Sequence, residues 1–189
     1  MAGCRTTHNP SVESGGATTA PTTDAPTPPS STPPSSATPA TPPISVPAPA
    51  ERAYLTAVRV AATEGGGSRV VFEFDPLVPG YLIDYTTRPV TEDGSGKEVT
   101  VAGDAVLQVR MENASGARIE GEKVIRTYTG PRRVAATGVG GVVTEAVDTG
   151  DFEGVVNWTV GLRQKVRAIT VTTLSGPSRL VIDVPAAEK

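Results

Sequence analysis

Apolar and polar side chains alternate with a period of two in several short runs after residue 53, and this period limits the fold more than any other feature. In the run 68–75, Val70 and Phe72 share one face while Glu73 lies on the other. Because successive side chains of a β-strand point to opposite faces, each run predicts a strand with one face on a core and one on solvent. The other clear runs are 80–85, 105–112 and 179–184.

Weaker alternating or apolar runs fill the rest of the chain after residue 53. They cover 54–62, 98–101, 123–128, 142–148, 154–162 and 166–174, and glycine-rich turn signals separate most of them. No long window keeps the three-to-four spacing of an amphipathic helix. The pattern therefore predicts an all-β fold, an antiparallel β-sandwich of about 8–10 short strands, with a small closed β-barrel as the alternative.

Two of the clear runs resemble each other. The stretch SRVVFEFD at 68–75 and the stretch SRLVIDVP at 178–185 both place Ser-Arg before alternating apolar and acidic residues. This echo favours two related sheets, although any two half-buried strands share such a pattern.

Composition divides the chain at residue 50. Twelve of the 18 prolines lie in 1–50, among Thr, Ser and Ala, while all eight aromatic residues lie after it. A segment so poor in large apolar side chains cannot bury enough surface to offset its chain entropy. We expect a disordered Pro/Thr/Ser-rich tether over 5–50, partly in the polyproline-II conformation, and one folded domain over 51–189.

The single cysteine, Cys4, lies outside the expected domain. The sequence Ala2-Gly3-Cys4 resembles the end of a bacterial lipobox, at which a signal peptide is removed and the cysteine acquires lipid. Met1 stands where Leu is usual, and no basic and apolar segment precedes the box. We therefore expect that residues 1–4 are a lipobox remnant, that the true start lies upstream, and that Cys4 is the lipid attachment site. A free thiol is the alternative.

The folded part resembles a known family. The runs YLTAVRVAATEGGGSRVVFEF, PGYLIDY, VVTEAVDTGDFEGVVNWTVGL and VTTLSGPSRLVIDV together are similar to the AMIN-like domain of actinobacterial lipoproteins, over residues 53–185. More distantly they resemble the AMIN domain of cell-wall amidases and secretins. The resemblance implies a β-sandwich, a location in the cell envelope and a non-catalytic binding role.

Few residues offer catalytic or metal-binding chemistry. The only histidine, His8, lies in the expected tether, so the domain has no imidazole for a nucleophile–base pair or a zinc site. Asp148, Asp151 and Glu153 could together hold Ca²⁺ or act as acid and base, but solvated carboxylates in a turn explain them more simply. We therefore predict no enzymatic activity, no metal and no cofactor.

The candidate ligand-binding residues are aromatic or basic. Tyr81, Tyr85 and Tyr128 are amphipathic and could stack on sugar rings or peptide at a surface groove. Arg69 and Arg179 begin the two similar strands and could bind carboxylates, with a strand-end salt bridge as the alternative. Arg132 and Arg133 form a basic spot that we interpret as a solvated turn.

These features predict a lipid-anchored, non-enzymatic binding module on the extracytoplasmic face of the bacterial cell membrane. Its expected partner is peptidoglycan or another envelope glycopolymer. The alternatives are an adaptor that docks an envelope protein and, third, an enzyme that uses carboxylates. The domain holds 16 basic and 18 acidic residues, which are the chain totals of 17 and 20 less Arg5, Glu13 and Asp24. This near-neutral balance argues against a nucleic-acid partner. We expect a monomer.

Overall fold

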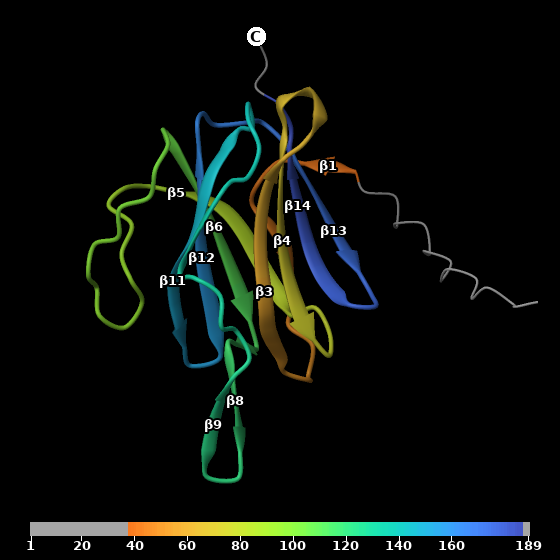
Figure 1. Ribbon diagram of the computed structural model, residues 1–189, viewed down its shortest axis with the longest axis vertical. Coiled ribbons are helices and arrows are strands. Elements are labelled where there is room, and N and C mark those ends of the chain that lie inside the picture. The colour runs from red at the N-terminus through yellow and green to blue at the C-terminus, as the bar shows by residue number, and fades with distance from the viewer. Residues whose placement is uncertain (1–37, 187–189) are drawn as a thin grey trace, which may run out of the picture. The chain divides into compact units, whose positions relative to one another are not determined.

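The computed structural model describes residues 38–186, which form two β-sheets packed face to face and a projecting hairpin (Figure 1). The first sheet has the order β1 (Pro39–Ala40), β13 (Ile169–Leu174), β14 (Ser178–Val184), β4 (Ser68–Asp75), β3 (Ala53–Ala62) and β7 (Ala114–Ser115). The second has the order β10 (Arg133–Ala135), β11 (Val143–Phe152), β12 (Val155–Leu162), β6 (Ala105–Glu112), β5 (Gly80–Thr86) and β2 (Ile44–Val46). Strands β8 (Ala117–Glu120) and β9 (Lys123–Arg126) form the hairpin. The predicted all-β sandwich is confirmed.

Neighbouring strands are antiparallel except for the parallel pair β3 and β7. A short 3₁₀ turn, Glu64–Gly66, connects β3 to β4. No helix among residues 38–186 is both long and apolar enough to cross a membrane.

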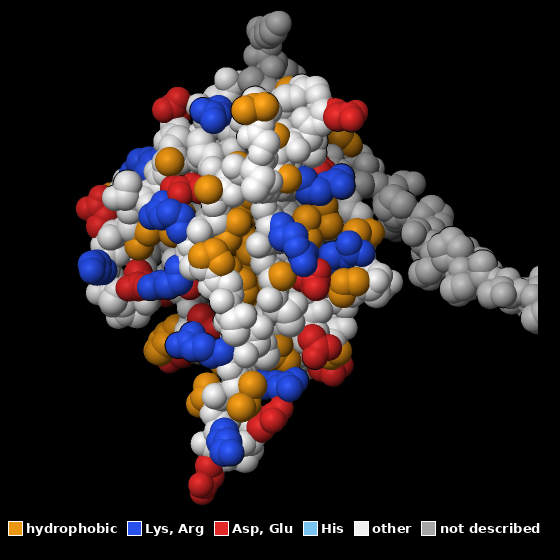
Figure 2. All heavy atoms as spheres, in the orientation of Figure 1, with side chains coloured by type: hydrophobic (Ala, Val, Ile, Leu, Met, Phe, Trp, Pro, Cys, Tyr) orange, Lys and Arg blue, Asp and Glu red, His pale blue; other side chains and the backbone are white. Residues whose placement is uncertain are grey.

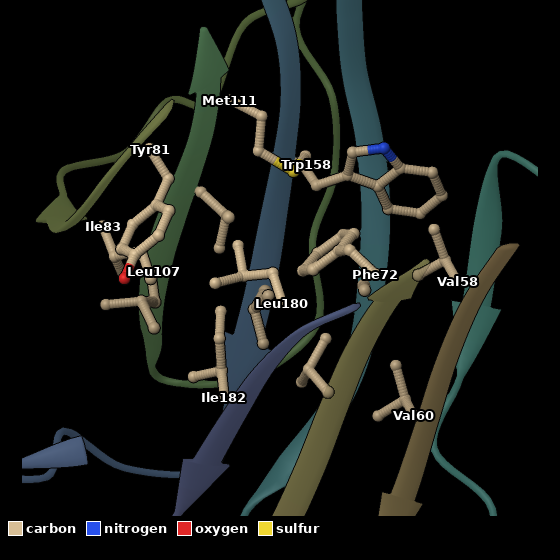
Figure 3. Packing of buried hydrophobic residues seen from close by; sticks show 14 of the residues in the cluster. Val58, Val60, Phe72, Tyr81, Ile83, Leu107, Met111, Trp158, Leu180 and Ile182 are labelled. Carbon is tan, nitrogen blue, oxygen red and sulfur yellow. The ribbon is translucent and has the colours of Figure 1, made fainter. Parts of the chain in front are cut away.

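The core fills the space between the two sheets, and Figure 3 shows how their side chains interdigitate. Val58, Phe72 and Leu180 project from the first sheet toward Leu107 and Trp158 of the second. The rings of Phe72 and Trp158 meet edge to face with their centroids 5.9 Å apart, a favoured aromatic geometry. Trp158 has only 1% of its surface exposed, so it lies in the core.

The outer face of the second sheet is also covered in part. Val106 and Val147 point away from the main core and pack against Val90 and Val101 of the loop 87–104. This second apolar cluster corrects the predicted strand at 98–101, because Val101 is buried and Val99 partly buried in a loop, and neither joins a sheet. The same loop reaches β12, where Asn157 donates to Asp93 and Gly161 lies against Ala102, so β12 is buried on both faces.

The N-terminal boundary of the fold lies earlier than predicted. The expected tether 5–50 contains two strands: β1 pairs with β13, and β2 pairs with β5. Ile44 packs against the core, which gives this otherwise polar segment a reason to bind the sandwich. The part of the expected tether before residue 38, and Cys4 with it, lies outside the described residues.

The echo strands occupy one sheet. β4 and β14 are direct neighbours, with Arg69 opposite Asp183 and Glu73 opposite Arg179. The prediction that the echo marks two related sheets is therefore wrong. The shared pattern instead places a basic residue of each strand opposite an acidic residue of the other, which favours this pairing.

Candidate functional site

Two surface hollows flank the loop 163–168, which leaves β12 in the second sheet and enters β13 in the first. One hollow has a volume of about 630 Å³ and reaches Arg69 and Asp183. The other, of about 500 Å³, reaches Asp84 and Tyr85. Both are lined by Lys165, Val166 and Arg167. We call these three residues and the two hollows the loop site.

Tyr85 fixes the loop to the second sheet. Its hydroxyl donates a hydrogen bond to the carbonyl oxygen of Val166 at 2.9 Å and accepts one from the amide of the same residue at 3.1 Å. The ammonium of Lys165 lies 4.5 Å from the centroid of the Tyr85 ring, in cation–π range. Burial raises the pKa of Tyr85, so its hydroxyl stays protonated and can donate at neutral pH.

The charges at the loop site differ in how far they are neutralised. Arg69 binds Asp183 in bidentate fashion, with nitrogen–oxygen distances of 2.6 and 3.0 Å. This contact raises the pKa of Arg69. Lys165 and Arg167 are exposed, and neither forms a salt bridge within the described part of the chain. Their charges are thus available to an anionic ligand.

These two exposed cations can be compared with the mixed charges on one face of the molecule. On the face drawn in Figure 2, Lys and Arg side chains are interspersed with Asp and Glu side chains, without one large basic patch. Glu64 and Asp84 also line the hollows. Lys165 and Arg167 can therefore bind individual carboxylates or phosphates, although the acidic residues nearby keep the site from being strongly basic.

The predicted ligand-binding residues do not form a single groove. Arg69 and Tyr85 line the two hollows of the loop site. Tyr81 is 7% exposed and lies in the core. Tyr128 packs edge to face on Trp158 with the ring centroids 5.6 Å apart, and its hydroxyl donates to the carbonyl of Pro131 at 2.7 Å. Arg179 donates to the carbonyl of Pro177 at 3.3 Å. Arg69 forms a salt bridge with Asp183, which is the alternative that the sequence left open for this residue.

Sequence reasoning missed Lys165 and Arg167. The signal was present, because Arg163, Lys165 and Arg167 place three cations within the stretch RQKVR, which runs from the end of the predicted strand 154–162 into the start of the predicted strand 166–174. The alternating pattern predicts strands, and it carries no information about which connecting residues bind a ligand. The two hollows form because residues distant in sequence contact the loop, as Tyr85 does through Val166.

The carboxylates considered for catalysis are engaged separately. Asp151 accepts a hydrogen bond from the amide of Gly116 at 2.7 Å, while Asp148 pairs with Arg132 at 3.1 Å. Arg132 also contacts Glu92 and lowers the pKa of that carboxyl. Residues 38–186 contain no group of three or more His, Cys, Asp or Glu side chains placed to hold a metal ion.

Arg132 and Arg133 are exposed, as predicted for a solvated segment, but Arg133 lies in β10 and both side chains form ion pairs. Arg132 bridges Glu92 and Asp148, at 2.5 and 3.1 Å. Arg133 pairs with Glu145, whose side chain is only 9% exposed. These ion pairs hold the loop 87–104 and β10 against β11, so they have a structural role.

Comparison with known proteins supplies the family. The model of the AMIN-like domain matches residues 53–186, more than half of the chain. No curated protein and no solved structure matches the chain. The matched segment begins at β3 and ends just after β14, so it includes both sheets of the sandwich except their edge strands β1 and β2. The chain therefore belongs to the AMIN-like domain family.

Proposed function

We propose that this protein is a lipid-anchored, non-enzymatic binding module of the cell envelope, whose loop site contacts peptidoglycan or another anionic wall polymer. The family membership carries the general part of this proposal. AMIN-like domains suggest an extracytoplasmic, envelope-associated location and are in general non-catalytic binding modules. The separate engagement of Asp148 and Asp151 agrees with a role that needs no acid–base pair.

The anchoring part of the proposal rests on the sequence. Cys4 follows Ala2-Gly3 as in a lipobox, and a Pro/Thr/Ser-rich segment separates it from the sandwich. A polyproline-II segment extends about 3.1 Å per residue, so about 30 such residues would span on the order of 90 Å. Multiple acyl chains on Cys4 would hold the protein at the membrane while the sandwich reaches the wall.

The exposed cations of the loop site support an anionic ligand. Lys165 and Arg167 lie where the two hollows meet, so one extended ligand could contact both cations and continue into either hollow. Wall polymers offer repeated carboxylates or phosphates on such an extended chain. Tyr85 supplies an aromatic edge beside them for a sugar ring or peptide.

Co-sedimentation of the full chain with isolated sacculi tests this function. We expect saturable pelleting that weakens as NaCl rises, because salt screens contacts between exposed charges. Lys165→Glu should weaken pelleting about tenfold, equivalent to about 1.4 kcal/mol. Lys97→Glu makes the same charge change in the loop 87–104, outside both hollows, and should pellet as the unmodified chain does.

A docking role for an envelope protein is the second candidate, and the edge of β13 favours it. β1 pairs with β13 only at Ile169 and Thr170, and no other described strand pairs with that edge over residues 171–174. Such an edge can accept an extended peptide as an additional strand. Absence of pelleting at any NaCl concentration would reject the wall-binding proposal and favour this one, which cross-linking in intact cells would then test.

A further inference from the structure

The β8–β9 hairpin leaves large apolar side chains in solvent. It projects beyond the ends of the two sheets in Figure 1, and Figure 2 shows hydrophobic side chains on it beside charged ones. Ile119 is 77% exposed and Val124 is 69% exposed. They are direct cross-strand partners, so they share one face of the hairpin. A hairpin with an uncovered apolar face is marginal in water and gains stability when another element covers it.

The base of the hairpin is nevertheless firmly held. Asp151 accepts the amide hydrogen of Gly116 at 2.7 Å. The carbonyl oxygen of Gly116 accepts hydrogen bonds from the amides of Thr127 and Tyr128, at 2.9 and 3.0 Å. Tyr128 in turn packs on Trp158 in the core. The base thus fixes the direction of the hairpin, although Ile119 and Val124 near its tip are uncovered.

β8 also has an open edge. Among the described strands only β9 pairs with it, so no strand covers its opposite edge. The amide of Ala117 donates to the hydroxyl of Ser115 at 3.2 Å, which leaves the part of this edge around Ile119 for another strand. We propose that this edge pairs antiparallel with β8 of a second copy of the chain, with the two-fold axis at Ile119. This replaces the monomer expected from the sequence.

The sequence of β8 is complementary to itself in that register. Ile119 faces Ile119 of the other copy, and Arg118 faces Glu120 in both directions across the axis. The apolar face becomes a continuous row, Val124–Ile119–Ile119–Val124. The other face carries Lys123, Glu120 and then Arg118 of the second copy, so its charges alternate in sign. Opposite charges and apolar side chains directly opposite each other stabilise antiparallel pairs.

Neighbouring registers and edges lack this complementarity. A shift of one residue puts Arg118 opposite Ile119 and separates the two Ile119 side chains onto opposite faces. Pairing β9 about its midpoint puts Lys123 opposite Arg126, which repel each other, and centring it on Val124 puts Lys123 opposite Ile125. The hairpin turn, Glu120-Gly121-Glu122, is acidic, which disfavours an anionic membrane as the partner.

Paired charge reversal tests the register. Two four-residue strands bury little area, so we expect a weak dimer whose population rises with protein concentration in sedimentation equilibrium of the full chain. Arg118→Glu leaves four acidic side chains at the axis and Glu120→Arg leaves four basic ones. Each variant alone should dimerise at least tenfold more weakly. An equimolar mixture of the two should recover the original affinity, because each Glu of one chain then faces an Arg of the other.

Recovery in the mixture shows that both variants are folded, so the weaker dimers of the single variants then cannot come from misfolding. Monomeric wild-type chain at every accessible concentration would overturn the proposal. So would single variants that dimerise as well as the wild type, or a mixture that fails to associate although circular dichroism shows both variants to be folded. An envelope protein that binds the hairpin while the chain remains monomeric would also overturn it.

Disulfide trapping gives an independent geometric test in a Cys4→Ser background. Residues directly opposite in an antiparallel pair have Cα atoms about 4.5–5.5 Å apart, within reach of a disulfide. Ile119→Cys should therefore form a covalent dimer on mild oxidation. Glu122→Cys is also exposed but lies several residues from the axis, and it should stay largely monomeric. Equal cross-linking of both variants would indicate random collision and contradict the proposed pairing.

Discussion

At the scale of single residues, Tyr85 connects the sandwich to the loop site through one hydroxyl group. Tyr85→Phe keeps the ring and the contact with Lys165 but leaves the amide and carbonyl of Val166 without this partner. Because Val166 is buried, we expect a loss of about 1–3 kcal/mol in the free energy of unfolding, measured by urea denaturation. The hydroxyl of Tyr54 forms no hydrogen bond within residues 38–186, so Tyr54→Phe is the matched control.

Arg132 and Glu92 make a second prediction at this scale, and it depends on pH. Arg132 lowers the pKa of Glu92 in the folded state, so the contact stabilises the fold above the unfolded-state pKa of Glu92, near 4.5. That stabilisation is lost as the pH falls through the lower folded-state pKa. Arg132→Gln should raise the folded-state pKa of Glu92 and flatten the acid side of a plot of thermal midpoint against pH. An unchanged Glu92 titration, followed by NMR, would contradict this account, while Arg132→Lys should retain part of the effect.

At the scale of elements, the segment before β3 belongs to the fold although its composition predicts a tether. A chain that begins at residue 51 loses β1, β2 and the contact of Ile44 with the core. Relative to a chain that begins at residue 38, we expect it to lose about 2–4 kcal/mol of unfolding free energy. The comparison needs two purified truncations and their urea midpoints, and equal midpoints would show that the two strands contribute no stability.

Gly80→Ala examines the same contact without a truncation. A Cβ at Gly80 would lie 2.4 Å from the Cα of Ala48, a distance that forces one of the two backbones to move. The variant should therefore release the segment from β5 and approach the stability of the shorter chain. Gly94→Ala is the control, because a Cβ at Gly94 meets nothing within 4 Å. Gly94 has a positive φ, so this control includes the backbone strain of placing alanine there. Its loss of unfolding free energy therefore gives an upper limit for a glycine substitution that makes no steric contact.

The same elements show what a sequence can and cannot reveal. Alternation identified β4, β5, β6 and β14, because each has one face on the core and one toward solvent. It failed at 98–101, where the apolar residues cover the outside of a sheet, and at β1 and β2, where proline-rich composition masked short edge strands. Arg69 and Tyr85 were predicted as ligand-binding residues. The cluster of cations around Lys165 and Arg167 is visible in the sequence, but the hollows beside it depend on long-range packing and are not.

At the scale of the whole molecule, one core joins the two sheets, and this determines how the domain unfolds. Trp158, the only tryptophan, comes from the second sheet and packs on Phe72 of the first, so its fluorescence reports on the contact between the sheets. Far-UV circular dichroism reports on the strands themselves. Because neither sheet can keep its apolar face covered alone, we expect both signals to change in one transition in urea.

Refolding should occur in milliseconds to seconds, as is typical of domains whose strands pair over long sequence separations. Here β4 pairs with β14, about a hundred residues later in the chain, so a large loop must close before that contact forms. Stopped-flow fluorescence of Trp158 measures this rate directly. If fluorescence and circular dichroism changed at separate urea concentrations, the sheets would unfold independently, and the core between them would not be the main source of cooperativity. Phe72→Ala distinguishes the two cases, because in a single cooperative unit it should shift both transitions together by about 3–5 kcal/mol.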